Sequence, residues 1–462
     1  KEGEKVEFTT TEENTVVVGL TDDVITALAA NPNGLYEKTN YTPETPLGAG
    51  TWMILVTPPA NNSAKIYNPM IASVYYKVSG SGSNNSLDSG TVDASQDWTL
   101  EESGAFAKSS EITLDKKLDN GNTDTEVSVG DTVSFTITTT IPSYDEKYYT
   151  NATFIIKDEI VNGLAYAKAN ETDANPTAPV VTVGGNPVEA GDGTYKLTWT
   201  PTTDGKPSFQ IAFDKKYLTN LAGAEETARA VTVKYSAKVT EDAVKRVGEN
   251  KASLEFSRTP SETDTKEDKE YVFTFALHGV FYKEDDNKNK LPDATFTLYV
   301  ADEGGNEEIE WKENDSINVS KVDNCTTEAD GEIKFKGLDG DKIYYLKETA
   351  SPSGYSINNR VYKVEFTFTK PDDYTGKNTT YTVTVTNNED DTTATSTVKY
   401  GEAVTDEYGN VAIGTQTNIP NTKLSSLPST GGIGTTIFTI GGCVIMIAAA
   451  ALFFATRRKN EK

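Results

Sequence analysis

Apolar and polar residues alternate with a period of two along most of the chain beyond the first hundred residues. One such series consists of Val127, Val129, Val133, Phe135, Ile137 and Ile141. The same spacing recurs in 231–239, 271–277, 296–300 and 364–368. This alternation is typical of strands with one buried face, and turn-forming clusters such as 119–122 separate the runs. The pattern predicts an all-β protein of tandem immunoglobulin-like β-sandwiches.

Charged, serine- and threonine-rich stretches interrupt the alternation at 101–110 and 261–270. The interruptions divide the 462 residues into an N-terminal domain, a middle β-sandwich, a third β-sandwich and a C-terminal segment, predicted at 1–106, 107–270, 271–426 and 427–462. A length near 150 residues per domain suits roughly three domains. In the first domain, Thr21, followed by Asp22 and Asp23, predicts the start of a helix that stops by Asn31.

The C-terminal segment contains an uncharged apolar run over 433–456, followed directly by Arg457, Arg458 and Lys459. As a helix the run would span roughly 36 Å, which is enough for a bilayer core of about 30 Å. The basic residues predict a short cytoplasmic end, with the first 426 residues outside. A lipid-anchor signal normally lacks such a basic stop. No signal peptide precedes Lys1, so the numbering is expected to begin near a mature N terminus.

Composition excludes several classes of site. The net charge of −26 argues against a nucleic-acid binder, which needs a basic face. A single histidine, His278, excludes sites that need several imidazoles, and it is expected to pack within a strand. The two cysteines, Cys325 and Cys443, fall in segments predicted to lie in different compartments, so Cys325 is expected to be a free thiol. We predict no metal and no cofactor.

The residues before the apolar run carry a motif. This motif is Leu427-Pro428-Ser429-Thr430-Gly431, and it is followed by the apolar run and the basic end. The three parts together resemble the cell-wall sorting signal of Gram-positive surface proteins. The resemblance implies that a sortase cysteine attacks the carbonyl of the Thr430–Gly431 bond, passes Thr430 to an amine and leaves the tail behind. Pro428 suits this role because it holds the segment extended for an enzyme groove.

A second resemblance lies in the third domain. Residues 344–355 resemble the E-box of sortase-assembled pilins, Y-x-L-x-E-T-x-A-P-x-G-Y, and depart from it at Ser351. Lys283-Glu284-Asp285 with 291–296 resembles the opening hairpin of collagen-adhesin B-type domains, and Asn421 occupies the position of their last strand. The resemblance implies a spontaneous amide bond between Lys283 and Asn421, assisted by Glu348, with release of ammonia.

The chemistry of such a bond can be argued from the residue types. Only a neutral amine attacks an amide, and burial lowers the pKa of a lysine. Burial raises the pKa of a carboxyl, so a lysine–glutamate pair can share its proton. The acid can then move protons between the attacking nitrogen and the leaving group while strands hold the reactants together.

The middle domain carries a comparable set. Lys116 shares its parity with Ile112, Leu114 and Leu118, so its amine is predicted to point inward, where it needs a partner. Asn250 similarly shares a predicted buried face with Ala252, Leu254 and Phe256. The segment resembles the middle domain of major pilins, which implies a Lys116–Asn250 bond assisted by Asp158. Lys117 and Glu159 are the alternatives of opposite parity.

A third candidate is a lysine that accepts the next subunit. Major pilins carry a Y-P-K-N-like motif at the end of their first domain, and Phe106-Ala107-Lys108-Ser109 occupies that place. Lys65 and Lys77, which flank Ile66-Tyr67-Asn68-Pro69, remain alternatives to Lys108. An acceptor needs an exposed amine, which a domain junction can provide.

Together these resemblances imply a major pilin: a structural backbone subunit, not an enzyme, of a covalent pilus on a Gram-positive cell wall. Expected partners are a sortase, further subunits of the same pilin, peptidoglycan and, transiently, the membrane. Host or matrix ligands are further candidates, and nucleic acid is excluded. The alternative is a wall-anchored adhesin or minor pilin; a surface-attached enzyme ranks third.

Overall fold

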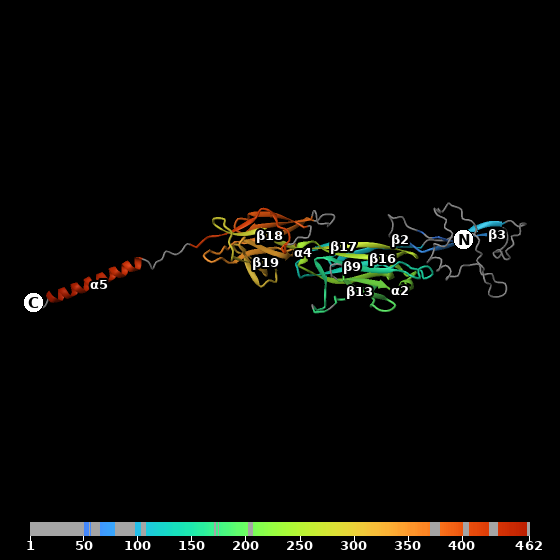
Figure 1. Cartoon of the computed structure of the whole chain (residues 1–462), viewed down its shortest axis with the longest axis horizontal. Helices are drawn as coiled ribbons and strands as arrows, with labels where there is room; N and C mark the ends of the chain where they lie inside the picture. Colours follow the sequence, from blue (N-terminus) through green and yellow to red (C-terminus); the bar gives the residue numbers. More distant parts are fainter. Residues whose placement is uncertain are drawn as a thin grey trace.

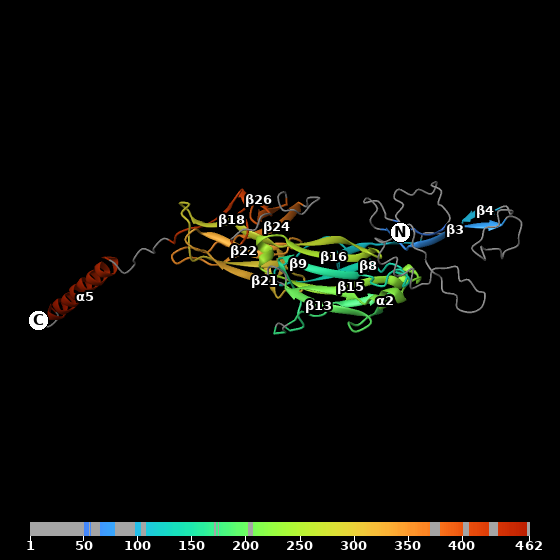
Figure 2. The same cartoon turned by 45° about the vertical axis from the view of Figure 1, so that its right-hand side comes forward.

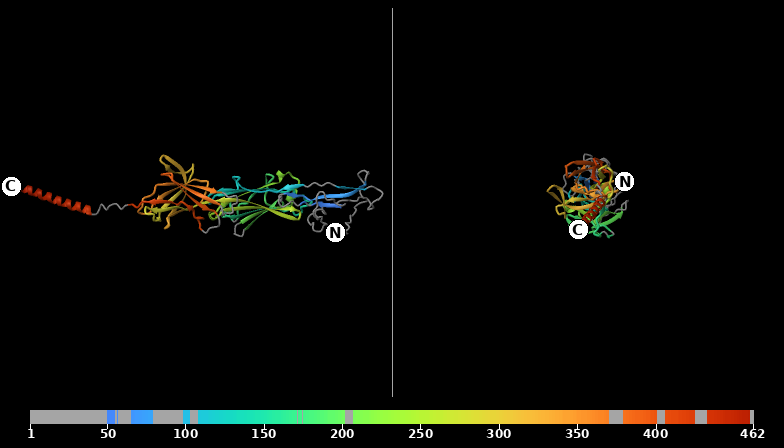
Figure 3. Two further views of the ribbon diagram at one scale, coloured as in Figure 1. Left: turned by 90° about the horizontal axis from the view of Figure 1, so that it is seen from above. Right: turned by 90° about the vertical axis from the view of Figure 1, so that its left-hand side faces the viewer.

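The computed structural model describes residues 50–54, 56, 65–78, 98–102, 108–170, 172–173, 175–201, 207–369, 379–400, 406–424 and 433–459. The helix predicted from Thr21 and the motif at 427–431 lie outside these residues. Two β-sandwiches follow one another along a long axis, and helix α5 (Ile433–Lys459) lies at one end of the molecule (Figures 1 and 3). The prediction of an all-β chain with an apolar C-terminal helix is confirmed.

The described N-terminal strands lead into the middle sandwich. A sheet of order β1–β3–β4 is formed by β1 (Gly50–Ile54), β3 (Met70–Val78) and β4 (Trp98–Glu102). A separate antiparallel pair is formed by β2 (Lys65–Tyr67) and β5 (Ser109–Glu111). Ile66 of β2 is buried in the core of the middle sandwich, so this pair packs onto that domain.

The middle sandwich consists of two sheets that pack face to face. The first has the order β12–β11–β15–β8–β6, with β10 paired to β15, and its strands are β6 (Leu114–Leu118), β8 (Thr132–Thr140), β10 (Leu164–Tyr166), β11 (Val180–Val183), β12 (Asn186–Pro187) and β15 (Ala230–Val239). The second has the order β13–β14–β9–β16–β17–β7, and its strands are β7 (Asp124–Glu126), β9 (Phe154–Asn162), β13 (Tyr195–Pro201), β14 (Pro207–Phe213), β16 (Gly248–Thr259) and β17 (Glu262–Phe273). Inward residues of both sheets, among them Phe135, Ile156 and Leu254, form one core.

Short helices occupy the connections of this sandwich. They are α2 (Lys215–Asn220), α3 (Glu226–Arg229) and α4 (Asp242–Lys245). Asp214 caps α2, because its side chain accepts hydrogen bonds from the first backbone amides of the helix. Helices α2 and α4 lie at opposite ends of the sandwich, with α4 next to the third domain (Figures 1 and 2).

The third sandwich also has two sheets. A sheet of order β22–β18–β28 contains β18 (Phe275–Asp285), β22 (Glu332–Leu338) and β28 (Thr417–Asn421). The facing sheet has the order β20–β21–β19–β23–β24–β25–β26–β27 and contains β19 (Thr295–Ala301), β20 (Glu307–Lys312), β21 (Asp315–Thr326), β23 (Tyr344–Ala350), β24 (Val361–Thr369), β25 (Thr380–Asn387), β26 (Thr393–Lys399) and β27 (Ile413–Gly414). Its core includes Phe281, Phe296, Leu346, Val383 and Ile419.

The junction between the sandwiches is short and in contact. β17 ends at Phe273 and β18 begins at Phe275, so Thr274 alone separates the two strands. The amide of Val129 donates to the carbonyl of Gly337 across the junction at 2.9 Å. Gly337 has a φ of +71°, and a Cβ there would lie 2.7 Å from that of Val129, so the close approach requires glycine.

The polar stretch 261–270 belongs to a strand. Instead of interrupting the sheet, it forms most of β17, which pairs along its length with β16 in an antiparallel hairpin. Its alternation went unrecognised in the sequence because charged and hydroxyl side chains occupy the solvent-facing positions, and only Glu270, Val272 and Phe273 are buried.

Candidate functional site

The third sandwich buries a lysine, a glutamate and an asparagine from three strands. Lys283 lies on β18, Glu348 on β23 and Asn421 at the end of β28, and their side chains are 0%, 1% and 2% exposed. β18 and β28 run parallel, with Lys283 opposite Ile419, so Lys283 and Asn421 lie near one another along the same ladder. The three residues predicted from the sequence are brought together.

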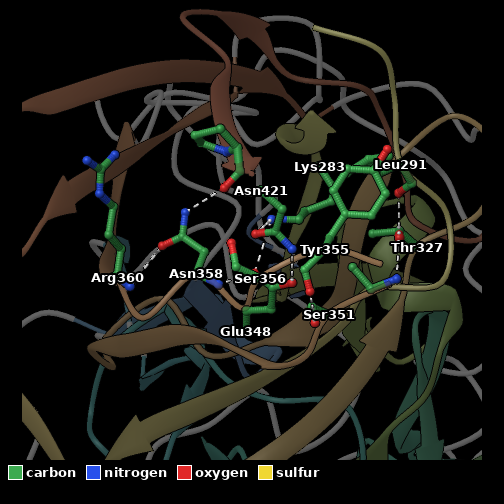
Figure 4. Close-up of polar contacts among 12 residues, drawn as sticks. Lys283, Leu291, Thr327, Glu348, Ser351, Tyr355, Ser356, Asn358, Arg360 and Asn421 are labelled. Carbon is green, nitrogen blue, oxygen red and sulfur yellow. Dashed lines mark hydrogen bonds and ion pairs between the residues drawn. The ribbon is translucent and has the colours of Figure 1, made fainter. Parts of the chain in front are cut away.

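Their polar groups form a closed triangle (Figure 4). Lys283 Nζ donates to Asn421 Oδ1 at 2.5 Å and to Glu348 Oε2 at 3.1 Å. Asn421 Nδ2 donates to Glu348 Oε1 at 2.7 Å. One carboxylate therefore contacts both the amine that would attack and the nitrogen that would leave, which is the placement a proton-transferring group needs.

Burial lowers the pKa of Lys283 even though Glu348 opposes the shift. The ring of Phe296 lies 5.7 Å from Nζ, and the surrounding core is apolar. A lowered pKa makes the neutral, nucleophilic amine more accessible than on a surface lysine.

Asn358 is a residue of this site that the sequence analysis missed. Its backbone amide donates to Glu348 Oε2 at 3.0 Å, and its Nδ2 donates to the carbonyl of Pro420 at 2.9 Å, next to Asn421 (Figure 4). Asn358 therefore connects Glu348 to the end of β28, the strand that carries Asn421. Asparagine in a loop carries no sequence signal for this role, because the two segments meet only in the fold.

Ser351, the residue that departs from the E-box pattern, forms a local hydrogen bond. Ser351 Oγ donates to the carbonyl of Tyr355 at 3.0 Å, within the turn that follows β23. The hydroxyl in place of alanine thus bridges the turn rather than entering the Lys283 cluster.

The middle sandwich buries a second set. Lys116 lies on β6 of one sheet, whereas Asp158 on β9 and Asn250 on β16 belong to the facing sheet, and all three are 0% exposed. The alternatives of opposite parity differ: the side chain of Lys117 is 48% exposed and that of Glu159 is 44% exposed.

Two tyrosines complete this second set. Lys116 Nζ donates to Asp158 Oδ2 at 2.5 Å, and Asp158 also accepts from the hydroxyls of Tyr166 and Tyr235, at 2.7 and 2.6 Å. Asn250 Nδ2 donates to the Tyr235 hydroxyl at 2.9 Å. Asn250 and Lys116 are therefore linked through Tyr235 and Asp158, whereas Lys283 and Asn421 contact each other directly.

Electrostatics in this set follow from burial. Desolvation lowers the pKa of Lys116 despite the nearby carboxyl of Asp158, and it raises the pKa of Tyr235 well above its ordinary value. The sequence series 231–239 indicated that Tyr235 faces the core, but not that its hydroxyl joins Asn250 to Asp158.

The candidate acceptor lysines differ in exposure. Lys108 is exposed directly before β5, and its carbonyl accepts a hydrogen bond from the amide of Asn68 at 3.1 Å. Lys65 is partly buried on β2 opposite Glu111, and Lys77 lies on β3. Lys108 therefore lies where the N-terminal strands meet the middle sandwich.

The remaining polar residues have local roles. His278 is buried, and its Nδ1 hydrogen-bonds to the carbonyl of Gly409 at 3.2 Å. Cys325 is a partly buried free thiol that accepts a hydrogen bond from the Lys334 amide, and Cys443 on α5 is also free. Within the described residues, no group of histidine, cysteine or acidic side chains could hold a metal ion.

The C-terminal helix has the properties of a membrane span. Residues Phe438–Arg457 are long and apolar enough to cross a bilayer, with a mean hydropathy of 2.3. With the two elongated sandwiches, this helix defines a class: a modular all-β protein with a C-terminal helix that could anchor it in a membrane.

Comparisons with known proteins narrow this class. Residues 279–370 match the SpaA family of prealbumin-like fold domains, and residues 419–462 match the LPXTG cell wall anchor motif. The trypsin-resistant surface T6 protein of Streptococcus pyogenes is 26% identical over 89% of this chain and 79% of its own length.

A solved pilin structure is similar to this chain in fold. The T6 backbone pilin of serotype M6 S. pyogenes, described as a modular three-domain structure, has 19% identity and a TM-score of 0.57, covering 90% of this chain and 92% of its own. The major pilin SpaA of Corynebacterium diphtheriae has 14% identity and a TM-score of 0.43, covering 69% and 70%. These similarities support a structural, cell-wall-anchored subunit of a Gram-positive pilus.

Proposed function

We propose that the subunits of this pilin are joined by amide bonds between Thr430 of one copy and Lys108 of the next. A sortase would cleave the Thr430–Gly431 bond, transfer Thr430 to the amine and leave α5 in the membrane. The last subunit of the filament would be attached in the same way to peptidoglycan. Lys108 is exposed and comes directly before β5, whereas β28 is the last strand before the sorting motif in the sequence, and this supports the head-to-tail order.

Within each subunit, Lys283 and Asn421 would form one amide and Lys116 and Asn250 another, assisted by Glu348 and Asp158. The observation that carries this proposal is the buried contact of 2.5 Å between Lys283 Nζ and the carboxamide oxygen of Asn421, with Glu348 touching both residues. The balanced reaction converts a lysine ammonium and a carboxamide into a secondary amide and an ammonium ion. Each bond therefore removes one ammonia, about 17 Da, from the chain.

Intact mass spectrometry of the folded ectodomain tests the intramolecular bonds. We expect a mass lower by two ammonia molecules than the sequence mass, and digest peptides that join Lys283 to Asn421 and Lys116 to Asn250. A full sequence mass with both peptide pairs unlinked would refute these bonds.

The intersubunit bond is tested in cells that assemble the pilus. Lys108→Ala should abolish the high-mass ladder of covalent polymers, whereas Lys65→Ala and Lys77→Ala should leave it. A normal ladder from Lys108→Ala would exclude Lys108 as the acceptor.

A further inference from the structure

Glu270 is a buried carboxyl that the proposed reaction of the middle sandwich leaves unexplained. It lies on β17, its side chain is 0% exposed, and neither carboxyl oxygen has a hydrogen-bond partner among the residues that the structure describes. An ionised carboxylate in this position would lose its hydration without compensation, which is costly. The site therefore favours a protonated Glu270.

Asn250 lies directly opposite Glu270 in the β16–β17 ladder. Side chains of directly opposed residues project to the same face, with Cβ atoms about 4.5–5.5 Å apart. The carboxamide oxygen of Asn250 is also buried and has no hydrogen-bond partner in the described part of the chain, while its nitrogen donates to the hydroxyl of Tyr235. A protonated carboxyl is the donor that this oxygen lacks, so the two unpaired groups are complementary only when Glu270 carries a proton.

Burial and neighbouring charges together shift the pKa of Glu270. This pKa is raised from 4.5 to about 8, and burial is the largest cause. Asp268 on the same strand, Asp115 on β6 and Asp124 on β7 also act to raise it, whereas Lys116 on β6 acts to lower it. The backbone amide of Lys116 donates to Asp268 Oδ2 on β17 at 2.7 Å, two positions before Glu270, so β6 and β17 are in contact at this site.

We propose that Glu270 is a second acid of the Lys116–Asn250 site, which donates a hydrogen bond from its protonated carboxyl to Asn250 Oδ1 as the amide forms. This inference rests on the proposed intramolecular bond. In this proposal the two carboxyls have different roles. Asp158 transfers protons between Lys116 Nζ and Asn250 Nδ2, and Glu270 stabilises the negative charge that develops on Asn250 Oδ1.

Lys116 gives a proton to Asp158, and its neutral Nζ attacks Cγ of Asn250, so that the carbonyl electron pair moves to Oδ1 and Glu270 stabilises the negative charge. Asp158 passes the proton through Tyr235 to Nδ2, the Cγ–Nδ2 bond breaks and ammonia leaves. The second proton of Nζ follows to ammonia, giving an ammonium ion, and Glu270 keeps its own proton.

The test starts from unreacted chain, purified under denaturing conditions from inclusion bodies and refolded at pH values from about 6 to about 10. Quantitative digestion measures the linked Lys116–Asn250 peptides over time, and the Lys283–Asn421 peptides in the same sample report on folding of the chain. Glu270→Ala and Glu270→Gln are compared with the wild type. Glu267→Ala, at an exposed position on the same strand, is the matched control.

Glu270→Ala should slow the Lys116–Asn250 bond by about 100-fold, the effect of removing one such donor, without changing the Lys283–Asn421 bond. Glu270→Gln keeps an N–H donor, so it should retain much of the rate. It should also remove the decline expected in the wild type above about pH 8, where Glu270 ionises.

Three results would overturn the proposal. Unchanged kinetics in Glu270→Ala would show that the carboxyl takes no part. A Glu270→Gln variant as slow as Glu270→Ala, with Lys283–Asn421 forming normally, would exclude the role of a neutral donor. If the wild type forms the Lys283–Asn421 bond but never the Lys116–Asn250 bond, the proposed function of the middle sandwich itself fails, and this inference fails with it.

Discussion

Lys283 and Lys116 share an environment that is unusual for lysine. Both are completely buried, both have one carboxylate within hydrogen-bonding distance, and desolvation lowers the pKa of both amines. The two sites differ in how the asparagine is held. Asn421 contacts its lysine directly, whereas Asn250 is reached through the hydroxyl of Tyr235. The same chemistry can therefore be set up with one acid in one sandwich and with a longer hydrogen-bond chain in the other.

The positioning role of Asn358 can be tested. Asn358→Ala removes the hydrogen bond to the Pro420 carbonyl, so Glu348 and Asn421 should be less well positioned. We expect the Lys283–Asn421 bond to form about tenfold more slowly, because small misplacements of reacting groups are costly, and to be measurable by refolding and digestion. Asn410→Ala, which removes a similar bond to the Lys399 carbonyl in a loop outside the cluster, is the control. Equal rates in the two variants would contradict a positioning role.

At the scale of strands, part of this arrangement could be predicted. Alternation alone placed Lys116 and Asn250 on buried faces and separated them from Lys117, because each apolar neighbour on the strand reports its orientation. The motif around Glu348 identified its strand and its turn. Glu270 could not be found in this way, since β17 carries charged residues at most of its positions and resembles a linker. Its importance depends on the pairing with β16, which no local pattern encodes.

The proposed cross-link of the third sandwich would also change the stability of this domain. Lys283 and Asn421 are 138 positions apart, so a bond between them closes nearly the whole domain into a loop and restricts the unfolded chain. Glu348→Gln, which keeps the shape of the site but removes the acid, should prevent the bond and lower the free energy of unfolding by about 2–5 kcal/mol. Denaturant unfolding, with mass spectrometry to verify the missing bond, measures this difference. An unlinked variant with an unchanged midpoint would show that the cross-link does not act through the unfolded chain.

On the scale of the whole molecule, the two sandwiches form a rod, and the residues proposed to form covalent bonds are distributed along its long axis. β2, which pairs with the strand β5 directly after Lys108, lies at the end of the middle sandwich that faces away from the third sandwich, and α5 lies beyond the other end of the pair (Figure 1). The junction is held by the near-continuous β17 and β18, by the contact of Val129 with Gly337, and by Lys336, which bridges Glu241 and Glu407 at 3.2 and 2.9 Å. Tension along the axis is therefore expected to act on both domains in series.

The hairpin of β16 and β17 lies between the two proposed cross-links along the chain. With both amides formed, a pull on the filament would enter β16 at Asn250 and leave along β17 toward Lys283, so most strands of both sandwiches would be bypassed. Asn250 and Glu270 face each other in this hairpin. Drawing the hairpin out would break the ladder between β16 and β17 and also the ladder between β16 and β9, because β16 lies between these two strands.

In a filament whose subunits are otherwise connected by covalent bonds, this hairpin would be a segment that can lengthen under tension. Residues 251–269 would lengthen each subunit by roughly 65 Å when fully drawn out, and re-forming the ladder would restore the original length. Single-molecule stretching of linked subunits should show this reversible step. Ser253 and Glu267 face each other in the ladder, so a disulfide introduced by Ser253→Cys with Glu267→Cys should remove this step. A step that persists in the disulfide-linked hairpin would show that another segment lengthens. The same strand pair that brings Glu270 to Asn250 would then let a pilus absorb sudden drag without breaking a covalent bond.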